Sequence, residues 1–250
     1  DECIDVLLLR WRQDKDKGDL VSRLGLAQFR SSDLLTLMAR LGFLAHDQAE
    51  RGDADDDTHR PADLAEGTVM GVLAEEFARY DESRKYALAQ TVVDALTQGN
   101  GLLLKRGPQT YAFPHRTFQE FLAGVHLKVQ RDYLKLCLER AGQAHWHEAL
   151  LLMASHQVLA GDEMERPLLL VERLLERGPI EQTLAGEMLY LIGRERVARY
   201  DPALLRKNGL WQRCRDALLK LATRGTAPQV PAALRVRAGL AAGLLSYGPL

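Results

Sequence analysis

The sequence has few of the residues that form a disulfide framework, a large β-sheet or a membrane span. Its three cysteines, Cys3, Cys137 and Cys214, are far apart and show no paired spacing, so we expect reduced, buried thiols rather than disulfides or a zinc site. Aromatic residues make up only 6% of the chain and β-branched residues are sparse, which disfavours extended sheet. No apolar run approaches the roughly 20 residues of a transmembrane helix. We therefore expect a cytoplasmic, mainly α protein without membrane association.

The chain also lacks an excess of either charge. Of its 250 residues 27% are charged, the net charge is −1 and 46% are hydrophobic, which is typical of a globular protein and argues against nucleic acid as a partner. The N-terminus is acidic and amphipathic and shows no signal-peptide pattern. Because the sequence has no initiator methionine and begins within an amphipathic pattern, we expect it to be part of a longer polypeptide.

Motifs of common catalytic and metal sites are missing as well. We find no phosphate-binding G-x-x-x-x-G-K-[ST] loop, no G-x-S-x-G elbow and no H-E-x-x-H helix. His145 and His147 lie two residues apart, so on a helix they point to different sides, and we interpret them as surface or boundary histidines. The acidic segment 46–61 lacks the glycine and distal glutamate of a calcium loop and is interpreted as a mobile loop. We expect no catalytic residues and no metal ligands in this chain.

Apolar spacing predicts helices in the first quarter of the chain. Ile4, Leu7, Leu8 and Trp11 indicate a helix over residues 2–14. A second stripe, formed by Leu34, Leu35, Met38, Leu41 and Leu44, follows the possible N-cap residues Ser31, Ser32 and Asp33. We assign residues 1–62 to a helical segment.

Residues 63–128 show the outline of a winged helix. A helix beginning at Asp63 or Thr68 is expected to bury Val69, Val72, Leu73 and Phe77, and a helix over 82–98 is expected to bury Tyr86, Ala89, Val93 and Leu96. Asn100-Gly101 and Gly107-Pro108 are turn signals on either side of a strand-like 102–105 segment, and 110–113 is strand-like again. Helices followed by a two-stranded hairpin are typical of a winged helix, with the hairpin as its wing.

Residues 129–250 carry only helical patterns. Apolar periodicity predicts helices near 146–158, 168–175, 184–192, 210–221 and 230–245, with breakers at Gly161-Asp162, Gly178-Pro179, Asp201-Pro202 and 225–231. Paired helices without strands suggest a HEAT-like array, but no clean repeat is visible and a compact bundle is the alternative. The predicted fold is thus mainly α: a helical subdomain and a winged helix with one small β-hairpin, then a HEAT-like helical array or bundle.

The segment 111–123, Y-A-F-P-H-R-T-F-Q-E-F-L-A, is the most distinctive part of the sequence. Phe118, Phe121, Leu122 and Val125 share one face of a helix, and Thr117 with Glu120 fits a capping box at its start. His115 is therefore expected just outside a helix N-terminus, where free amides and the helix dipole favour anions such as phosphate. A core-facing helix preceded by an ordinary linker histidine is the simpler alternative.

These residues resemble the winged-helix motif F-x-H-x-x-F-Q-E-F-L-A-A of NACHT-type STAND nucleoside triphosphatases, which include NOD-like receptors and bacterial defence proteins. The match runs from Phe113 and His115 through the stretch from Phe118 to Ala123, with Gly124 in place of the last alanine. The opening D-E-C-I-D-V-L-L-L-R-W is similar to a helix that follows the nucleotide-binding core of these proteins. The resemblance covers about the first half of the chain.

The resemblance implies a function that the residues alone do not specify. In these proteins the histidine matching His115 contacts the phosphates of bound ADP and holds the closed, inactive state. The expected cofactor is ADP or ATP with Mg, bound mainly by an upstream module of the same polypeptide. The expected partners are this upstream nucleotide-binding domain, further copies of the protein on activation, and an unknown protein or ligand trigger recognised by the helical region. Signalling or defence would be the biological context.

Two other function classes remain open at the level of sequence. A winged helix can read DNA with its third helix, here starting with Arg84 and Lys85, while the wing contributes Lys105 and Arg106. That surface is poor in phosphate contacts. The chain could also be a helical interaction scaffold in which His115 only packs.

Overall fold

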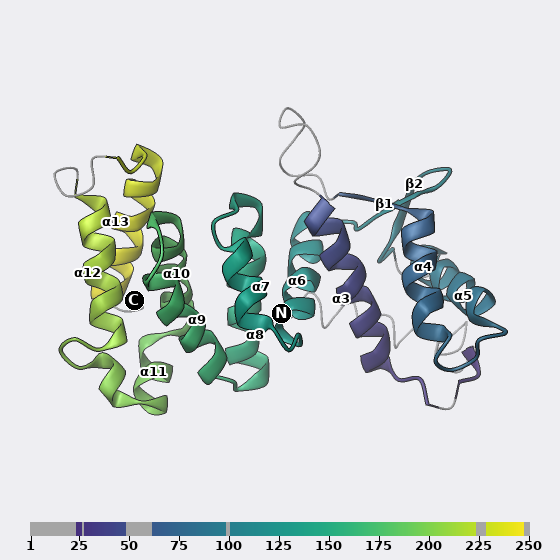
Figure 1. The fold of residues 1–250 in the computed structure, drawn as a ribbon, viewed down its shortest axis with the longest axis horizontal. Helices are drawn as coiled ribbons and strands as arrows, with labels where there is room; N and C mark the ends of the chain where they lie inside the picture. The colour runs from purple at the N-terminus through teal and green to yellow at the C-terminus, as the bar shows by residue number, and fades with distance from the viewer. Residues whose placement is uncertain (1–23, 27, 49–61, 99–100, 224–228, 248–250) are drawn as a thin grey trace. The chain divides into compact units, whose positions relative to one another are not determined.

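The computed structural model describes residues 24–26, 28–48, 62–98, 101–223 and 229–247 (Figure 1). The helix predicted at 2–14, Cys3 and most of the acidic segment 46–61 lie outside these residues. Contacts divide the chain into two compact units, residues 1–126 and 127–250. The described residues are mainly helical, with one small antiparallel sheet, which confirms the predicted fold class.

Helix α3 (Ser31–Gln48) begins close to the predicted N-cap residues. The Asp33 carboxylate accepts a hydrogen bond from the amide of Arg30 at 2.7 Å, and the Arg30 carbonyl accepts the first helical bond from Leu34. Arg30 therefore occupies the N-cap position, and Asp33 stabilises the helix start from its first turn. Leu34, Met38 and Leu41 are buried, as predicted.

Helices α4 (Glu66–Phe77) and α5 (Lys85–Gln98) pack against each other in the same unit. The four residues expected to be buried on α4 are buried, but one prediction for α5 is wrong. Tyr86 is 63% exposed and lies under the Lys85 ammonium, 5.4 Å from its ring centre. The buried stripe of α5 is formed instead by Leu88, Ala89, Val92, Val93 and Leu96.

The sheet has three strands rather than the predicted two. Strands β2 (Leu104–Gly107) and β3 (Thr110–Ala112) form the predicted hairpin, and β1 (Asp63–Ala65) pairs antiparallel with β3 in the order β1-β3-β2. The strand β1 occupies residues that we had expected at the start of a helix, so α4 begins only at Glu66. Leu64 is fully buried opposite Tyr111, and this pairing explains the extended conformation.

The second unit contains only helices within its described residues. Their bounds are α7 (Tyr133–Arg140), η2 (Ala144–Trp146), α8 (His147–Gly161), α9 (Glu165–Leu175), α10 (Pro179–Ile192), α11 (Arg194–Tyr200), η3 (Pro202–Leu205), α12 (Leu210–Ala222) and α13 (Ala232–Tyr247). The five long helices predicted from periodicity are confirmed, and the predicted breakers separate them. No helix among the described residues is both long and apolar enough to cross a bilayer.

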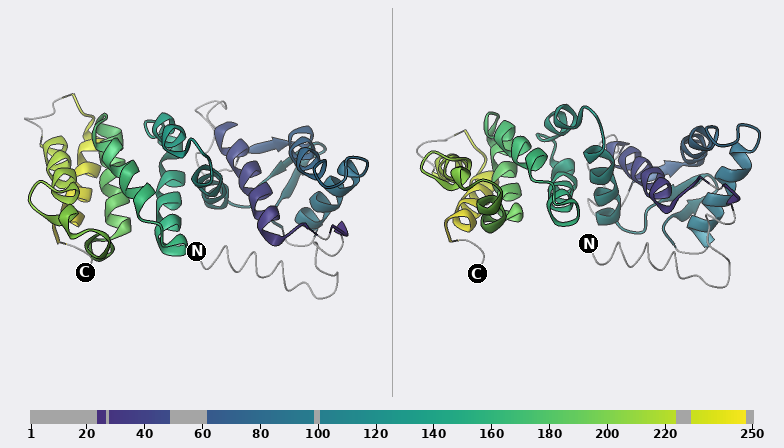
Figure 2. Two further views of the ribbon diagram at one scale, coloured as in Figure 1. Left: turned by 60° about the horizontal axis from the view of Figure 1, so that its bottom comes forward. Right: turned by 90° about the horizontal axis from the view of Figure 1, so that it is seen from below.

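The long helices of this unit pack in two layers (Figures 1 and 2). Helix α9 contacts α7 and α12 in one layer, and α10 contacts α8 and α13 in the other. The pairs α9–α10 and α12–α13 connect the layers. At one crossing the helices approach so closely that a Cβ on Gly186 of α10 would lie 2.4 Å from Leu218 Cδ1 of α12.

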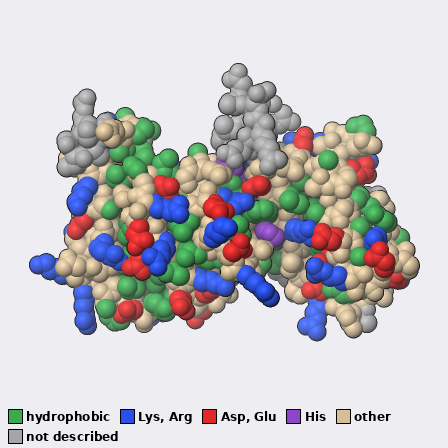
Figure 3. Space-filling view, in the orientation of Figure 1, with side chains coloured by type: hydrophobic (Ala, Val, Ile, Leu, Met, Phe, Trp, Pro, Cys, Tyr) green, Lys and Arg blue, Asp and Glu red, His purple; other side chains and the backbone are tan. Residues whose placement is uncertain are grey.

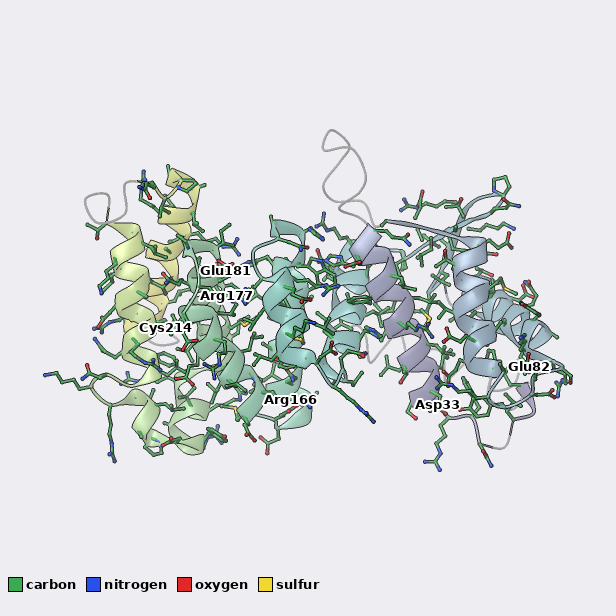
Figure 4. All side chains as sticks on the ribbon, viewed as in Figure 1. Asp33, Glu82, Arg166, Arg177, Glu181 and Cys214 are labelled. Atoms are coloured by element: carbon green, nitrogen blue, oxygen red, sulfur yellow. The ribbon has the colours of Figure 1, made fainter. Side chains whose placement is uncertain are left out.

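Arginine side chains satisfy carbonyls at two helix ends of this unit. Arg166 donates a hydrogen bond to the carbonyl of Lys128 at 2.8 Å, and Arg177 donates to the carbonyl of Leu138 at 3.0 Å (both arginines are labelled in Figure 4). Carbonyls in the last turn of a helix have no partner within the helix, so these bonds stabilise the ends of α6 and α7.

A cluster of polar side chains, partly exposed at its arginine, links the three helices of the second layer. The Glu187 carboxylate on α10 lies 2.7 Å from His147 Nε2 on α8 and 2.5 Å from Arg237 Nε on α13. Burial by itself would raise the pKa of Glu187, but hydrogen bonds from His147 and Arg237 outweigh it, and the pKa is lowered. His147 is only 7% exposed, so our interpretation of it as a surface or boundary residue was wrong.

Candidate ligand-contact site at the start of α6

The candidate residue His115 lies in a short connection between β3 and helix α6 (Arg116–Lys128). Its carbonyl accepts a hydrogen bond from the Gln119 amide at 3.3 Å, so His115 occupies the N-cap position, just outside the helix as predicted. Its side chain is exposed. The capping-box prediction was wrong, because α6 begins one residue before Thr117 and Thr117 is thus inside the helix.

Two aromatic side chains fix the connection at both ends. Phe113 is fully buried and Phe118 is 6% exposed. Their rings meet edge to face, with centres 5.7 Å apart and planes at 67°, a favourable geometry for aromatic pairs. The two residues between Phe113 and Arg116 are therefore held by anchored neighbours, and of the two Pro114 is half-buried and His115 is exposed.

Gln119 ties α6 to two segments that are distant in sequence. Its side chain is 1% exposed, its carbonyl oxygen accepts from the amide of Ala62 at 2.9 Å, and its amide nitrogen lies 3.2 Å from His46 Nδ1. His46 is fully buried in the last turn of α3, and Ala62 directly precedes β1. No sequence pattern pointed to His46 as the partner of Gln119.

Glu120 is held by the first residue of the helix. The Arg116 Nε lies 2.8 Å from Glu120 Oε1, and the Glu120 side chain is 7% exposed. This i,i+4 pair engages the Arg116 guanidinium, which could otherwise have placed a positive charge beside His115.

A close helix crossing holds α6 against α3. A Cβ built on Gly42 would lie 2.5 Å from the Cβ of Leu122 and 3.3 Å from the Gln119 carbonyl oxygen. Real Cβ atoms do not approach so closely, so the crossing requires glycine at position 42. The consequence is that α3 sets the position of α6 and therefore of the helix start at which His115 lies.

The arrangement offers one exposed imidazole next to the free amides of a helix N-terminus. Such a site can donate hydrogen bonds to an anion. Among the described residues no group of three or more His, Cys, Asp or Glu side chains could hold a metal ion.

Comparisons with known proteins show the family to which the chain belongs. No curated protein and no solved structure matches the chain significantly. A family model described as a winged helix-turn-helix domain C-terminal to NACHT matches residues 1–127, which include α3, the sheet and nearly all of α6. The chain therefore belongs to the family of winged helix-turn-helix domains that lie C-terminal to a NACHT domain.

Proposed function

We propose that this chain is the regulatory part of a NACHT-type STAND NTPase and that His115 donates a hydrogen bond to a phosphate of ADP. The nucleotide would be bound mainly by the NACHT module upstream in the same polypeptide, with Mg accompanying the triphosphate form. The single observation that carries this proposal is the contrast in burial within the motif: His115 is exposed, whereas Phe113, Phe118 and Gln119 are buried.

Packing explains the buried motif residues but gives no reason for a histidine at position 115. Phe113 and Phe118 contact each other, and Gln119 bonds to two other segments. An exposed side chain could be replaced by many others without loss of core contacts. A role toward a ligand is the explanation that fits both its exposure and its place beside free helix amides.

The proposed mechanism is a switch between two states of the parent protein. In the ADP-bound state the His115 contact would hold the winged helix against the nucleotide module. Exchange of ADP for ATP would remove this contact, release the winged helix and allow homo-oligomerisation. The two-layered helical unit would act as a HEAT-like sensor array for a protein or ligand trigger, in a cytoplasmic signalling or defence pathway.

Charge pairing on α5 and the wing favours this proposal over DNA binding. Lys85 is paired with Glu82 at 2.5 Å, and Arg106 lies 3.5 Å from Asp63. Binding to the DNA backbone depends on lysine and arginine side chains that contact phosphates and displace the counterions bound there. Cations already paired with carboxylates are poorly suited to that task.

The test compares His115→Ala with Thr117→Ala in the polypeptide that includes the NACHT module. Thr117 is exposed two residues away, so its substitution controls for changes at the helix start. Loss of a hydrogen bond to a charged phosphate is worth roughly 1.5–3 kcal/mol, so His115→Ala should speed ADP release and raise basal oligomerisation roughly 10- to 150-fold. Unchanged ADP release with a lowered melting temperature would instead identify His115 as a packing residue.

A further inference from the structure

An open groove in the second unit lies where α8 ends and α11 passes beside it. Its volume is about 600 Å³. The residues that line it come from α8, from the connection between α8 and α9 and from α11: Val158, Leu159, Asp162, Met164, Arg196, Arg199 and Tyr200. None of them takes part in the His115 site, which belongs to the other unit.

The groove has an apolar floor and an exposed rim. Val158 and Met164 are 4% and 8% exposed, whereas Leu159 and Tyr200 are each 50% exposed. Asp162 follows the last residue of α8 and has a φ of 47°, in the left-handed region, and the resulting turn separates α8 from α9. Val197 is fully buried and anchors α11, which leaves Arg196, Arg199 and Tyr200 on its outer side.

The charge at the rim is not neutralised by neighbours. Arg199 has no hydrogen bond or ion pair with any other residue that the structure describes, and Arg196 reaches only the carbonyl of Ile192, at the end of α10, at 3.4 Å. Several other arginines of this unit pair with acids, as Arg213 does with Glu172 at 2.7 Å. Figure 3 shows the same intermixing of basic and acidic side chains on the face of this unit that it displays.

The shape of the groove selects a polypeptide rather than a small molecule. Small-molecule sites bury roughly 70–90% of their ligand, which a groove with half-exposed Leu159 and Tyr200 side chains cannot do. Tyrosine and arginine around an apolar centre are typical of the residues that dominate protein–protein binding energy. Arg196 and Arg199 against the single acid Asp162 give the lining a positive balance.

We propose that this groove docks a peptide segment of a partner protein in which an aliphatic side chain is flanked by carboxylates. The aliphatic group would pack on Val158, Met164 and Leu159. The carboxylates would pair with the Arg199 and Arg196 guanidiniums, which can bind a carboxylate through two parallel hydrogen bonds. The inference goes beyond the nucleotide switch and does not depend on it, because the groove residues and the His115 site lie in different units.

The test begins with a random library of displayed peptides, from which binders to the whole 250-residue chain are selected. The selected peptides are then synthesised and their affinity is measured by fluorescence anisotropy. The selected peptides should carry Asp or Glu within a few residues of Leu, Ile or Val, and added salt should weaken their binding. Arg199→Glu should weaken binding by about tenfold or more. Arg194→Glu is the matched control, since Arg194 is exposed on the same helix but outside the groove.

Three results would overturn the proposal. One is a selection that enriches no acidic-aliphatic peptide. Another is an equal loss of binding in the Arg194→Glu and Arg199→Glu variants, because that would indicate a general charge effect. The third is binding of vesicles containing anionic lipid that Arg199→Glu removes while peptides show no binding, because the groove would then serve a membrane surface. ADP release by the parent protein enters none of these measurements.

Discussion

Replacement of Gly42 by alanine tests whether the crossing of α3 and α6 sets the position of the candidate site. The added Cβ would lie 2.5 Å from the Cβ of Leu122 and 3.4 Å from the amide nitrogen of Ala123. A Cβ is fixed to the backbone and cannot rotate away, so one of the two helices must shift. Gly71 on α4 is the control, because a Cβ at this position meets no atom within 4 Å.

The two substitutions should change stability in opposite directions. Alanine is favoured over glycine inside a helix by roughly 0.5–1 kcal/mol. Gly71→Ala should therefore stabilise the first unit by about that amount. Overpacking typically costs roughly 1–3 kcal/mol, and the rigid contact at Gly42 places this variant near the upper end. After the helix-propensity gain, Gly42→Ala should destabilise the unit by about 2 kcal/mol.

Native-state hydrogen exchange is the suitable assay, because it reports each unit separately while a single melting curve mixes both. The amides of α3 and α6 should lose protection in Gly42→Ala and gain it in Gly71→Ala, while those of α12 and α13 stay unchanged. Equal stabilisation by both substitutions would refute the close crossing and, with it, the argument that α3 positions His115.

Glu187, the two buried cysteines and the separation of the chain from its NACHT module can each be tested. Glu187→Gln should destabilise the second unit by roughly 1–3 kcal/mol in urea titrations at neutral pH, toward the lower end because the Arg237 side chain is 42% exposed. The pKa of Glu187 is lowered in the folded state. Its contribution to stability is therefore complete above the unfolded pKa of about 4.3 and is lost as the pH falls below that value. The unfolding free energies of wild type and variant should converge at such low pH, and a difference that stays constant with pH would contradict this. Burial raises the pKa of Cys137 and Cys214 to about 12, so both thiols should react with iodoacetamide only after unfolding, and rapid labelling of either residue in the native chain would show that it is accessible. The chain without its NACHT module should show no ATPase activity and little ADP affinity by calorimetry, since one donor cannot offset the entropy lost on binding.

Local periodicity was sufficient to predict most of the helices but not the elements that depend on distant partners. Strand β1 has only Leu64 as a buried residue, and it is extended because it pairs with β3. Helix α11 was not predicted, because Val197 is its only buried residue and no stripe is visible. Tyr86 was misplaced because it fits the helical spacing of Ala89 and Val93 yet lies in the exposed first turn of α5.

At the candidate site, too, features set by the local sequence could be predicted, whereas contacts with distant residues could not. The place of His115 before α6 could be predicted, since the motif switches from strand to helix at that point. The partners of Gln119 could not, because a glutamine does not indicate which of many distant groups it will bond. The cluster of His147, Glu187 and Arg237 was missed for the same reason.

The bonds of Gln119 also constrain how the chain can fold during synthesis. Its partners His46 and Ala62 precede it by 73 and 57 residues. Strand β1 likewise can pair only after β3 has emerged from the ribosome. The helices of the second unit mostly contact near neighbours in sequence and can form as they are made. Formation of long-range contacts is slow because loops must close first. The N-terminal unit should therefore stay incomplete until α6 is synthesised, so that the segment carrying His115 is the last piece required for its folding.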